Sequence, residues 1–360
     1  MVAGLAPQAK SMMRSRLRTA ALVAVAVAGA LAALPPTAQA HGPIAPVASS
    51  YLARVTSAPA GLDARVVDGD LRMWLSAPPG ETVVVLDYRG APYLRFSRSG
   101  VWVNHNSAMY YLNQTPFAER PPARLGPKTP PRWELVSTGH DYNWHDGRLH
   151  ALAAVALSSG QSYVGKWRVP VLVDGSLSSI SGGLWHAADP SIVWFWPIVV
   201  LLLCVLAAWR VKNQAVDRWT ARLLGLAALA AVAVVAVGRE LHGRPTVSVI
   251  QLLELAALMA FVAWGLARIG WRRAGHFTYF FIGLVALLEG AELIPTLVNG
   301  FVLMAVPAFL ARTATVLCLG ASIGLFLMVL RIFDQRHDAG REGQSVEGRE
   351  GGDDSAVELV

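Results

Sequence analysis

The densest group of reactive side chains in this sequence lies between His140 and His150. Three imidazoles and two carboxylates fall within these eleven residues, and such groups are the usual ligands of copper and zinc. The predicted metal ligands in this segment are His140, His145, Asp146 and His150. Residues five apart point to opposite faces of a strand, so the histidines converge only in an irregular loop. Gly139 and Gly147 permit such a loop, although the spacing matches no standard zinc pattern.

A structural role for the same segment is the competing interpretation. Asp146 and Arg148 are two residues apart and would share one face of a strand, where they can form an ion pair. Trp144 would then fill the core beneath the turn. The sequence favours this structural role, and metal binding, with copper as the expected metal, is the alternative.

His41 is a fifth candidate metal ligand because of the segment that precedes it. Residues 10–18 are basic, Thr19–Leu34 is a short apolar core, and Ala38-Gln39-Ala40 fits a signal-peptidase site. Cleavage there leaves His41 as the first residue, whose free amine and ring can chelate copper together. In this one residue, followed by glycine, the mature start resembles copper-brace secreted proteins. An uncleaved membrane anchor is the alternative to a signal peptide.

A second group of ionisable side chains lies in apolar segments of the C-terminal half. Such side chains usually face the interior of a helix bundle and pair with one another. We expect one cluster near the outer surface, made of His242, Gln251, Glu254, Glu289, Glu292 and Arg312. The functional interpretation is an outward-opening ion, proton or metal site of a transporter or membrane enzyme. The structural interpretation is an Arg312–Glu salt bridge beside a protonated Glu.

The elements that position this cluster are five predicted transmembrane helices. They are Ser191–Trp209, Trp219–Val237, Val247–Ile269, Phe277–Val298 and a longer segment within Phe301–Leu330. Each is long enough to cross about 30 Å of hydrocarbon as a helix. Hydrophobic residues make up 54% and charged ones 15% of the 360 residues, which is typical of a membrane protein and not of a nucleic-acid binder. The lipid bilayer is therefore the expected surrounding.

Basic residues between the spans predict their orientation. They concentrate in the first and third connections and at the start of the tail, at Arg210, Lys212, Arg218, Arg222, Arg268, Arg272, Arg273, Arg331 and Arg336. The second connection has Arg239 and Arg244 offset by Glu240, and the fourth has no charge. The positive-inside rule places the basic connections and the tail in the cytoplasm. The N-terminal domain then lies outside, as the signal peptide also requires.

Residues 41–188 show the alternation of β-strands. The clearest predicted strands are Asp63–Val67, Leu71–Leu75, Thr82–Tyr88, Tyr93–Phe96, Val101–Asn104, Trp133–Ser137 and Tyr163–Val173. Turn pairs such as Asp68-Gly69 and Asp174-Gly175 separate them. Short strands at regular spacing predict an antiparallel β-sandwich. Cys204 and Cys318, the only cysteines, lie in the spans, so no disulfide supports this domain.

Several motifs resemble an uncharacterised family of bacterial secreted and membrane-anchored proteins. In order, they are Pro92-Tyr93-Leu94-Arg95, Gly100-Val101, Asn104, Ser107, Tyr111-Leu112-Asn113, Pro130-Pro131-Arg132-Trp133, Trp144-His145-Asp146-Gly147-Arg148-Leu149-His150 and Trp167-Arg168-Val169-Pro170 with Asp174-Gly175. The chain departs from the family pattern at Gly147, where the family has His, and at Ala151-Leu152, where it has Trp-Met. The resemblance implies a shared domain but no activity.

The sequence thus predicts an extracytoplasmic antiparallel β-sandwich followed by a five-helix transmembrane bundle in a bacterial plasma membrane. The expected boundaries are a signal peptide at 1–40, the sandwich at 41–188, the spans at 189–332 and a disordered cytoplasmic tail at 333–360. A binding or structural role toward an external ligand or protein partner is the leading hypothesis. Metal handling is the alternative, and a transporter or membrane enzyme the third. The sequence holds no nucleophile elbow, phosphate loop or dinucleotide fingerprint, which argues against catalysis.

Overall fold

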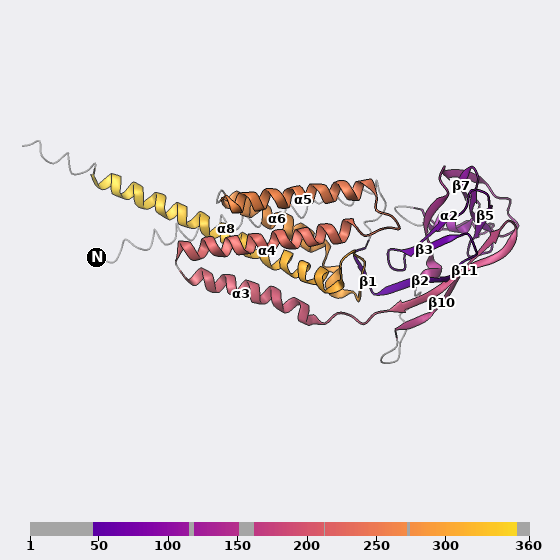
Figure 1. The fold of residues 1–360 in the computed structure, drawn as a ribbon, viewed down its shortest axis with the longest axis horizontal. Helices are drawn as coiled ribbons and strands as arrows, with labels where there is room; N and C mark the ends of the chain where they lie inside the picture. The colour runs from indigo at the N-terminus through magenta and orange to yellow at the C-terminus, as the bar shows by residue number, and fades with distance from the viewer. Residues whose placement is uncertain (1–45, 115–118, 151–161, 212, 272–273, 351–360) are drawn as a thin grey trace, which may run out of the picture.

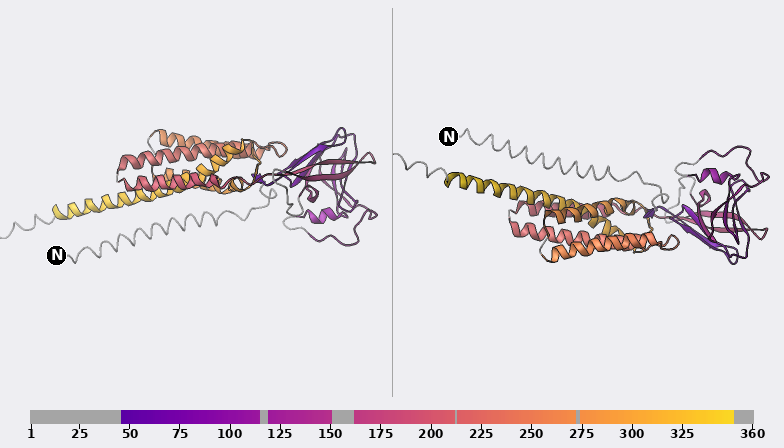
Figure 2. Two further views of the ribbon diagram at one scale, coloured as in Figure 1. Left: turned by 90° about the horizontal axis from the view of Figure 1, so that it is seen from below. Right: turned by 90° about the horizontal axis from the view of Figure 1, so that it is seen from above.

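A β domain and a helix bundle lie end to end in the structure (Figure 1). The structure, a computed structural model, describes residues 46–114, 119–150, 162–211, 213–271 and 274–350, with side chains as far as residue 331. The same arrangement is visible from both sides of the molecule in Figure 2, where the sheets extend beyond one end of the helices. The chain order is strands first and long helices second, as the sequence predicts.

The β domain contains two antiparallel sheets. The larger has seven strands in the order β2 (Tyr51–Ser57), β11 (Ser176–His186), β10 (Tyr163–Val173), β5 (Val83–Leu86), β6 (Pro92–Ser97), β7 (Gly100–Asn104) and β8 (Trp133–Ser137). The smaller has three strands in the order β3 (Asp63–Val67), β4 (Arg72–Ser76) and β9 (Asp141–His145). Two short helical segments, α2 (Ala108–Leu112) and the 3₁₀ turn η2 (Gly147–Leu149), complete the domain.

Both sheets contribute to one hydrophobic core. Met73 and Leu75 of β4 are fully buried, as are Val85, Phe96 and Val169 of the larger sheet, and all five belong to one cluster. In the strands that form this core, alternate residues point into it because successive side chains of a strand face opposite sides. Burying this apolar surface is the main force that holds the two sheets together.

The predicted hairpin turns are confirmed by their backbone geometry. Asp174 and Gly175, which join β10 to β11, have φ angles of 47° and 81°. Asp68 and Gly69, which follow β3, have φ angles of 60° and 82°. Left-handed backbone at both central residues defines the turns whose twist matches that of the flanking strands, and Asp-Gly tolerates it best.

The helical part contains four helices that are long and apolar enough to cross a membrane. These spans are Ile192–Arg210 (the 3₁₀ turn η3, Ile192–Phe195, with α3, Trp196–Arg210), α4 (Gln214–Glu240), α5 (Val249–Gly270) and Ala308–Arg331 of α8 (Ala308–Glu350). The helix α6 (His276–Glu292) has 17 residues and packs in the same hydrophobic cluster. Side chains of α4 and α8 are mostly buried in this cluster, whereas those of α3 and α5 are mostly exposed.

Two predicted segments differ from the structure. Phe277–Val298 is divided, because α6 ends at Glu292 and a separate short helix, α7 (Pro295–Val298), follows with Pro295 at its first position. Proline fits the first turn of a helix but cannot continue one, which explains the break. The last span begins at Ala308, and the preceding Phe301–Val302 forms strand β12.

The tail also differs from its prediction in part. The sequence predicts disorder from residue 333, whereas in the structure α8 continues as one helix to Glu350. Adding a residue to an existing helix costs far less than starting one, so a packed span can extend into polar sequence. Residues 351–360 lie outside the described residues.

Candidate functional site

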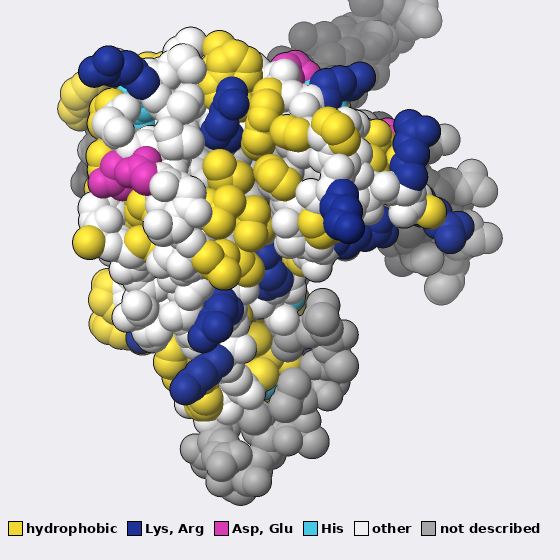
Figure 3. All heavy atoms as spheres, turned by 90° about the vertical axis from the view of Figure 1, so that its right-hand side faces the viewer, with side chains coloured by type: hydrophobic (Ala, Val, Ile, Leu, Met, Phe, Trp, Pro, Cys, Tyr) yellow, Lys and Arg dark blue, Asp and Glu magenta, His cyan; other side chains and the backbone are white. Residues whose placement is uncertain are grey.

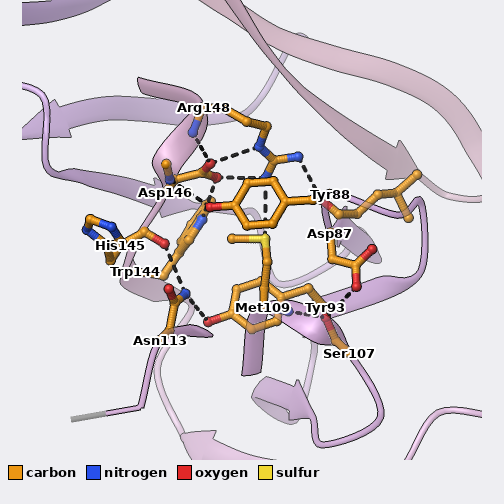
Figure 4. A network of polar contacts seen from close by, with 12 residues as sticks. Asp87, Tyr88, Tyr93, Ser107, Met109, Asn113, Trp144, His145, Asp146 and Arg148 are labelled. Carbon is orange, nitrogen blue, oxygen red and sulfur yellow. Dashed lines mark hydrogen bonds and ion pairs between the residues drawn. The ribbon is translucent and has the colours of Figure 1, made fainter. Parts of the chain in front are cut away.

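The segment from Trp144 to Arg148 lies at the centre of a polar network in the β domain (Figure 4). Asp146 is 0% exposed. It accepts hydrogen bonds from Trp144 Nε1 at 2.9 Å and from Arg148 Nε and Nη2 at 2.8 and 2.7 Å. Arg148 also donates to the Leu86 carbonyl at 3.0 Å, and its guanidinium lies over the Tyr88 ring. The predicted Asp146–Arg148 ion pair and the burial of Trp144 are therefore confirmed.

A second buried carboxylate, Asp87, belongs to the same region. Its Oδ1 accepts from the backbone amides of Arg89 and Ala91, each at 2.8 Å. Its Oδ2 accepts from Ser107 Oγ at 2.9 Å and from the Ala108 amide at 3.0 Å, which fixes the start of α2. Buried carboxylates are stable only when their oxygens are paired in this way. Protein donors thus occupy Asp87 and Asp146, and both act as structural groups.

His145 and His150 lie side by side at the edge of this network. The turn η2 reverses the chain after β9 and brings their ring centroids to 4.9 Å. His150 Nδ1 lies 3.0 Å from Asp70 Oδ2, while its Nε2 is buried and has no hydrogen-bond partner in the described part of the chain. Burial, followed by the charge of His150, lowers the pKa of His145, so this ring is neutral at neutral pH. A carboxylate that fixes one ring nitrogen and leaves the other free is the usual arrangement of a metal-binding histidine.

The other predicted metal ligands do not join this pair. His140 precedes β9 at the end opposite His145, and its carbonyl accepts from the Ala77 amide at 3.0 Å. Asp146 is occupied as described above, and His41 lies outside the described residues. Within the described ranges, no three His, Cys, Asp or Glu side chains form a group that could hold a metal ion. Metal binding stays a prediction, for which His145 and His150 are the two residues that lie together.

The helix bundle holds an ion-pair cluster at its end next to the β domain. Arg239 of α4 pairs with Glu240 at 2.5 Å, with Glu289 at 3.0 Å and with Glu292 at 2.5 Å. Glu240 is 2% exposed, and Glu254 of α5 is near enough to interact with it electrostatically. The pairs from Arg239 to Glu289 and Glu292 connect α4 to α6. This cluster could hold a proton or cation, and that activity stays a prediction.

Gln251 connects the third helix to the same cluster. Its Nε2 donates to the carbonyls of Glu240 and His242, each at 3.1 Å. Its side chain also forms a capping box with Ser248 at the start of α5. The structure therefore places five of the six predicted polar residues at one end of the bundle: His242, Gln251, Glu254, Glu289 and Glu292.

Arg312 does not belong to the cluster, and its predicted salt bridge with a glutamate is wrong. Its guanidinium donates to the backbone carbonyls of Thr296 at 2.9 Å, Asn299 at 3.2 Å and Gly300 at 3.1 Å. It thereby satisfies carbonyls that the end of α7 leaves unpaired. The cation that pairs with the glutamates is Arg239, which in the sequence is one of the charges of the second connection. The only sequence signal for this role is its position directly before Glu240.

The loop that Arg312 holds forms a joint with the N-terminal segment of the β domain. Strand β1 (Ala48–Ser49) pairs with β12, with Ser49 opposite Phe301. Val47 is 6% exposed and belongs to the hydrophobic cluster of the bundle. Its carbonyl accepts from the Leu303 amide at 2.8 Å, and Ser50 Oγ donates to Asn299 Oδ1 at 2.9 Å. The β domain is thus fixed to the helices by main-chain, side-chain and core contacts.

Charged residues form a second contact between the two parts. Asp68 of the β3–β4 turn lies 4.0 Å from Arg244 Nε in the α4–α5 loop and 3.7 Å from Arg72 Nε. Burial lowers the pKa of Arg244, and the negative charges of Asp68 and Glu240 partly offset this lowering. Burial also lowers the pKa of His242, with a smaller effect from Arg244. This contact lies close to the Arg239 cluster, because Arg244 follows Glu240 by only four residues in the chain.

Comparison of the chain with protein-family models, with curated proteins and with solved structures finds no match. The resemblance carried by the motifs between Pro92 and Gly175 therefore stays a prediction.

Proposed function

We propose that this protein is a membrane-anchored binding protein. In this proposal residues 41–188 form an extracytoplasmic β-sandwich that recognises a ligand or partner outside the cell. The helices α3, α4, α5, α6 and α8 form a five-helix transmembrane bundle, and the C-terminal end lies in the cytoplasm. The apolar helices and the basic connections of the sequence support this topology.

The observation that carries the proposal is the joint between β1 and β12. A domain that is only tethered needs no contact beyond its linker, and relative motion is then the default. Here Val47 packs in the bundle core, and β1 shares a sheet with the loop before α8. A displacement of the β domain would therefore move the α7–α8 loop directly. The joint suits a protein that transmits an external binding event to its membrane part.

A disulfide across the joint tests this proposal. We expect Ser49→Cys with Phe301→Cys to form a disulfide spontaneously in cells, because facing residues of antiparallel strands have the required Cα separation. Disulfides form outside the cytoplasm, so the same result tests the external placement. The variant should carry Cys204→Ser and Cys318→Ala, and maleimide–polyethylene glycol labelling with and without reductant gives the readout.

The matched control pairs Phe301→Cys with Ser57→Cys, at the far end of β2. This pair should label fully without reductant. Full labelling of the Ser49/Phe301 pair would show that the joint does not exist or lies in the cytoplasm, and the proposal would be wrong.

Metal capture is a second candidate function, favoured by the His145–His150 pair. We expect the purified full-length protein to bind one Cu(II) more tightly than about 10 μM, because two imidazoles are already side by side. Isothermal titration calorimetry measures the affinity. The copper affinity of the double variant His145→Ala with His150→Ala should be at least about tenfold lower, since each substitution removes one ligand.

His140→Ala is the matched control because it removes a nearby histidine that lies outside the pair. Its copper affinity should equal that of the unaltered protein. If the three proteins bind copper equally, or none binds it, the pair is not a metal site.

A further inference from the structure

The outer face of the seven-stranded sheet, turned away from the shared core, carries a row of apolar side chains with one arginine among them. Strand registers place the following residues side by side across six strands: Leu177, Leu172, Val84, Arg95, Trp102 and Leu135. Their sequence neighbours, such as Val83, Val85 and Val101, are fully buried, so alternation directs the row outward. Leu177 and Leu135 are 73% and 41% exposed. The row is therefore a surface feature made by six separate strands.

Arg95 is held in the middle of this row by two tryptophans. Its guanidinium carbon lies 5.2 Å from the ring centroid of Trp102 and 4.8 Å from that of Trp133. Its Nε is buried and has no hydrogen-bond partner among the residues that the structure describes. Stacking between aromatic rings orients a guanidinium while leaving its donors free for a carboxylate or phosphate.

The same face has an uncompensated positive charge. Arg54, Lys166 and Arg168 point outward with Arg95, and none of these four cations has an acidic partner in the described ranges. The only acidic residue in the seven strands is Glu134, which contacts His105. The complementary partner is therefore anionic.

The row lies far from the helices. Leu177 and His186, which lies next to the joint, are nine positions apart along β11, and this corresponds to about 30 Å at roughly 3.3 Å per residue. Figure 3 views this far end and shows a band of hydrophobic side chains bordered by Lys and Arg, with few acidic side chains. At this distance the row itself does not reach the headgroups of the membrane that the helices would cross, whereas Arg54 and Lys166, which flank Gly183, lie three residues of β11 from His186.

We propose that the outer face of the seven-stranded sheet binds an acidic polysaccharide of the cell surroundings. Sugar rings present flat C–H surfaces, which pack on tryptophan and leucine side chains, and uronate carboxylates accept bidentate hydrogen bonds from a guanidinium. An acidic polysaccharide presents both features, and this face presents apolar side chains with cations beside them. The inference rests on the proposed function in one respect, because the face must lie outside the cell.

The test measures binding of the full-length protein, in detergent micelles, to immobilised polygalacturonate and to neutral dextran. We expect binding to polygalacturonate alone, and weakening as salt rises. Arg95→Gln should weaken it by at least about tenfold, because it removes the oriented cation. Lys166→Gln with Arg168→Gln should weaken it as well, and this pair keeps the test valid if Arg95→Gln fails to fold.

The matched control is Trp74→Ala on the three-stranded sheet, where Arg65 stacks on Trp74 at 5.5 Å in the same way. Its affinity should be unchanged. The inference would be overturned if the protein bound dextran as tightly as polygalacturonate, or bound neither. It would also be overturned if Trp74→Ala lost as much affinity as Arg95→Gln, or if neither Arg95→Gln nor the Lys166/Arg168 variant lost affinity. The Ser49/Phe301 disulfide distinguishes failure of this inference from failure of the proposed function. If the disulfide forms but polygalacturonate does not bind, only the polysaccharide inference fails.

Discussion

Arg239→Ala is expected to destabilise the helix bundle by about 3–5 kcal/mol. The substitution leaves Glu240 (2% exposed) and Glu289 without the cation that lies 2.5 and 3.0 Å away. An uncompensated buried carboxylate is far more costly than the loss of one hydrogen bond. Thermal unfolding of the purified protein in detergent, followed by loss of the monodisperse gel-filtration peak, measures the change.

Two further variants separate the role of this cation from general damage. Glu292→Gln should have a small effect, because the Glu292 side chain is 48% exposed and solvent screens its pair with Arg239. Adding Glu240→Gln to Arg239→Ala should recover much of the loss, since it removes the buried charge. A stability of Arg239→Ala equal to that of the unaltered protein would show that the cluster does not hold α4 to α6.

Asp146→Ala is expected to destabilise the β domain by about 3–5 kcal/mol. Asp146 is fully buried and pairs with Arg148 through two hydrogen bonds, so its removal leaves the guanidinium and the Trp144 N–H without their acceptor. Tryptophan fluorescence during urea unfolding reports the change, because Trp144 lies in the core.

The chain supplies a matched control for this prediction. Asp63 and Arg65 are also two residues apart and also pair at 2.7 Å, but about half of each side chain is exposed. Asp63→Ala should therefore cost less than about 1 kcal/mol. If Asp63→Ala and Asp146→Ala are equally stable, burial does not determine the strength of the Asp146–Arg148 pair.

The His140–His150 segment combines a structural half with a half that could bind a ligand. Trp144, Asp146 and Arg148 point into the domain and hold the turn, whereas His145 and His150 lie at its edge. Loss of folding on substitution of Asp146 would therefore not be evidence that it binds metal.

Local features of the structure could be predicted from the sequence. Asp63–Val67 has the same bounds in the structure, and Asp174-Gly175 forms the expected hairpin turn. Both depend on interactions within a few residues, such as side-chain alternation and left-handed backbone, which the sequence shows directly. The long apolar helices are equally local, because their length and composition suffice.

Contacts between distant segments were decided only by the tertiary structure. β1 and β12 have two residues each and show no periodicity, yet their pairing joins residues more than 250 positions apart. The sequence predicts Arg312 as the partner of a glutamate, but the rotation of each helix places Arg239 beside Glu289 and Arg312 on backbone carbonyls. The sequence by itself determined the types of element and their order. Which polar groups meet depends on helix rotation and strand register, and packing of the whole chain sets both.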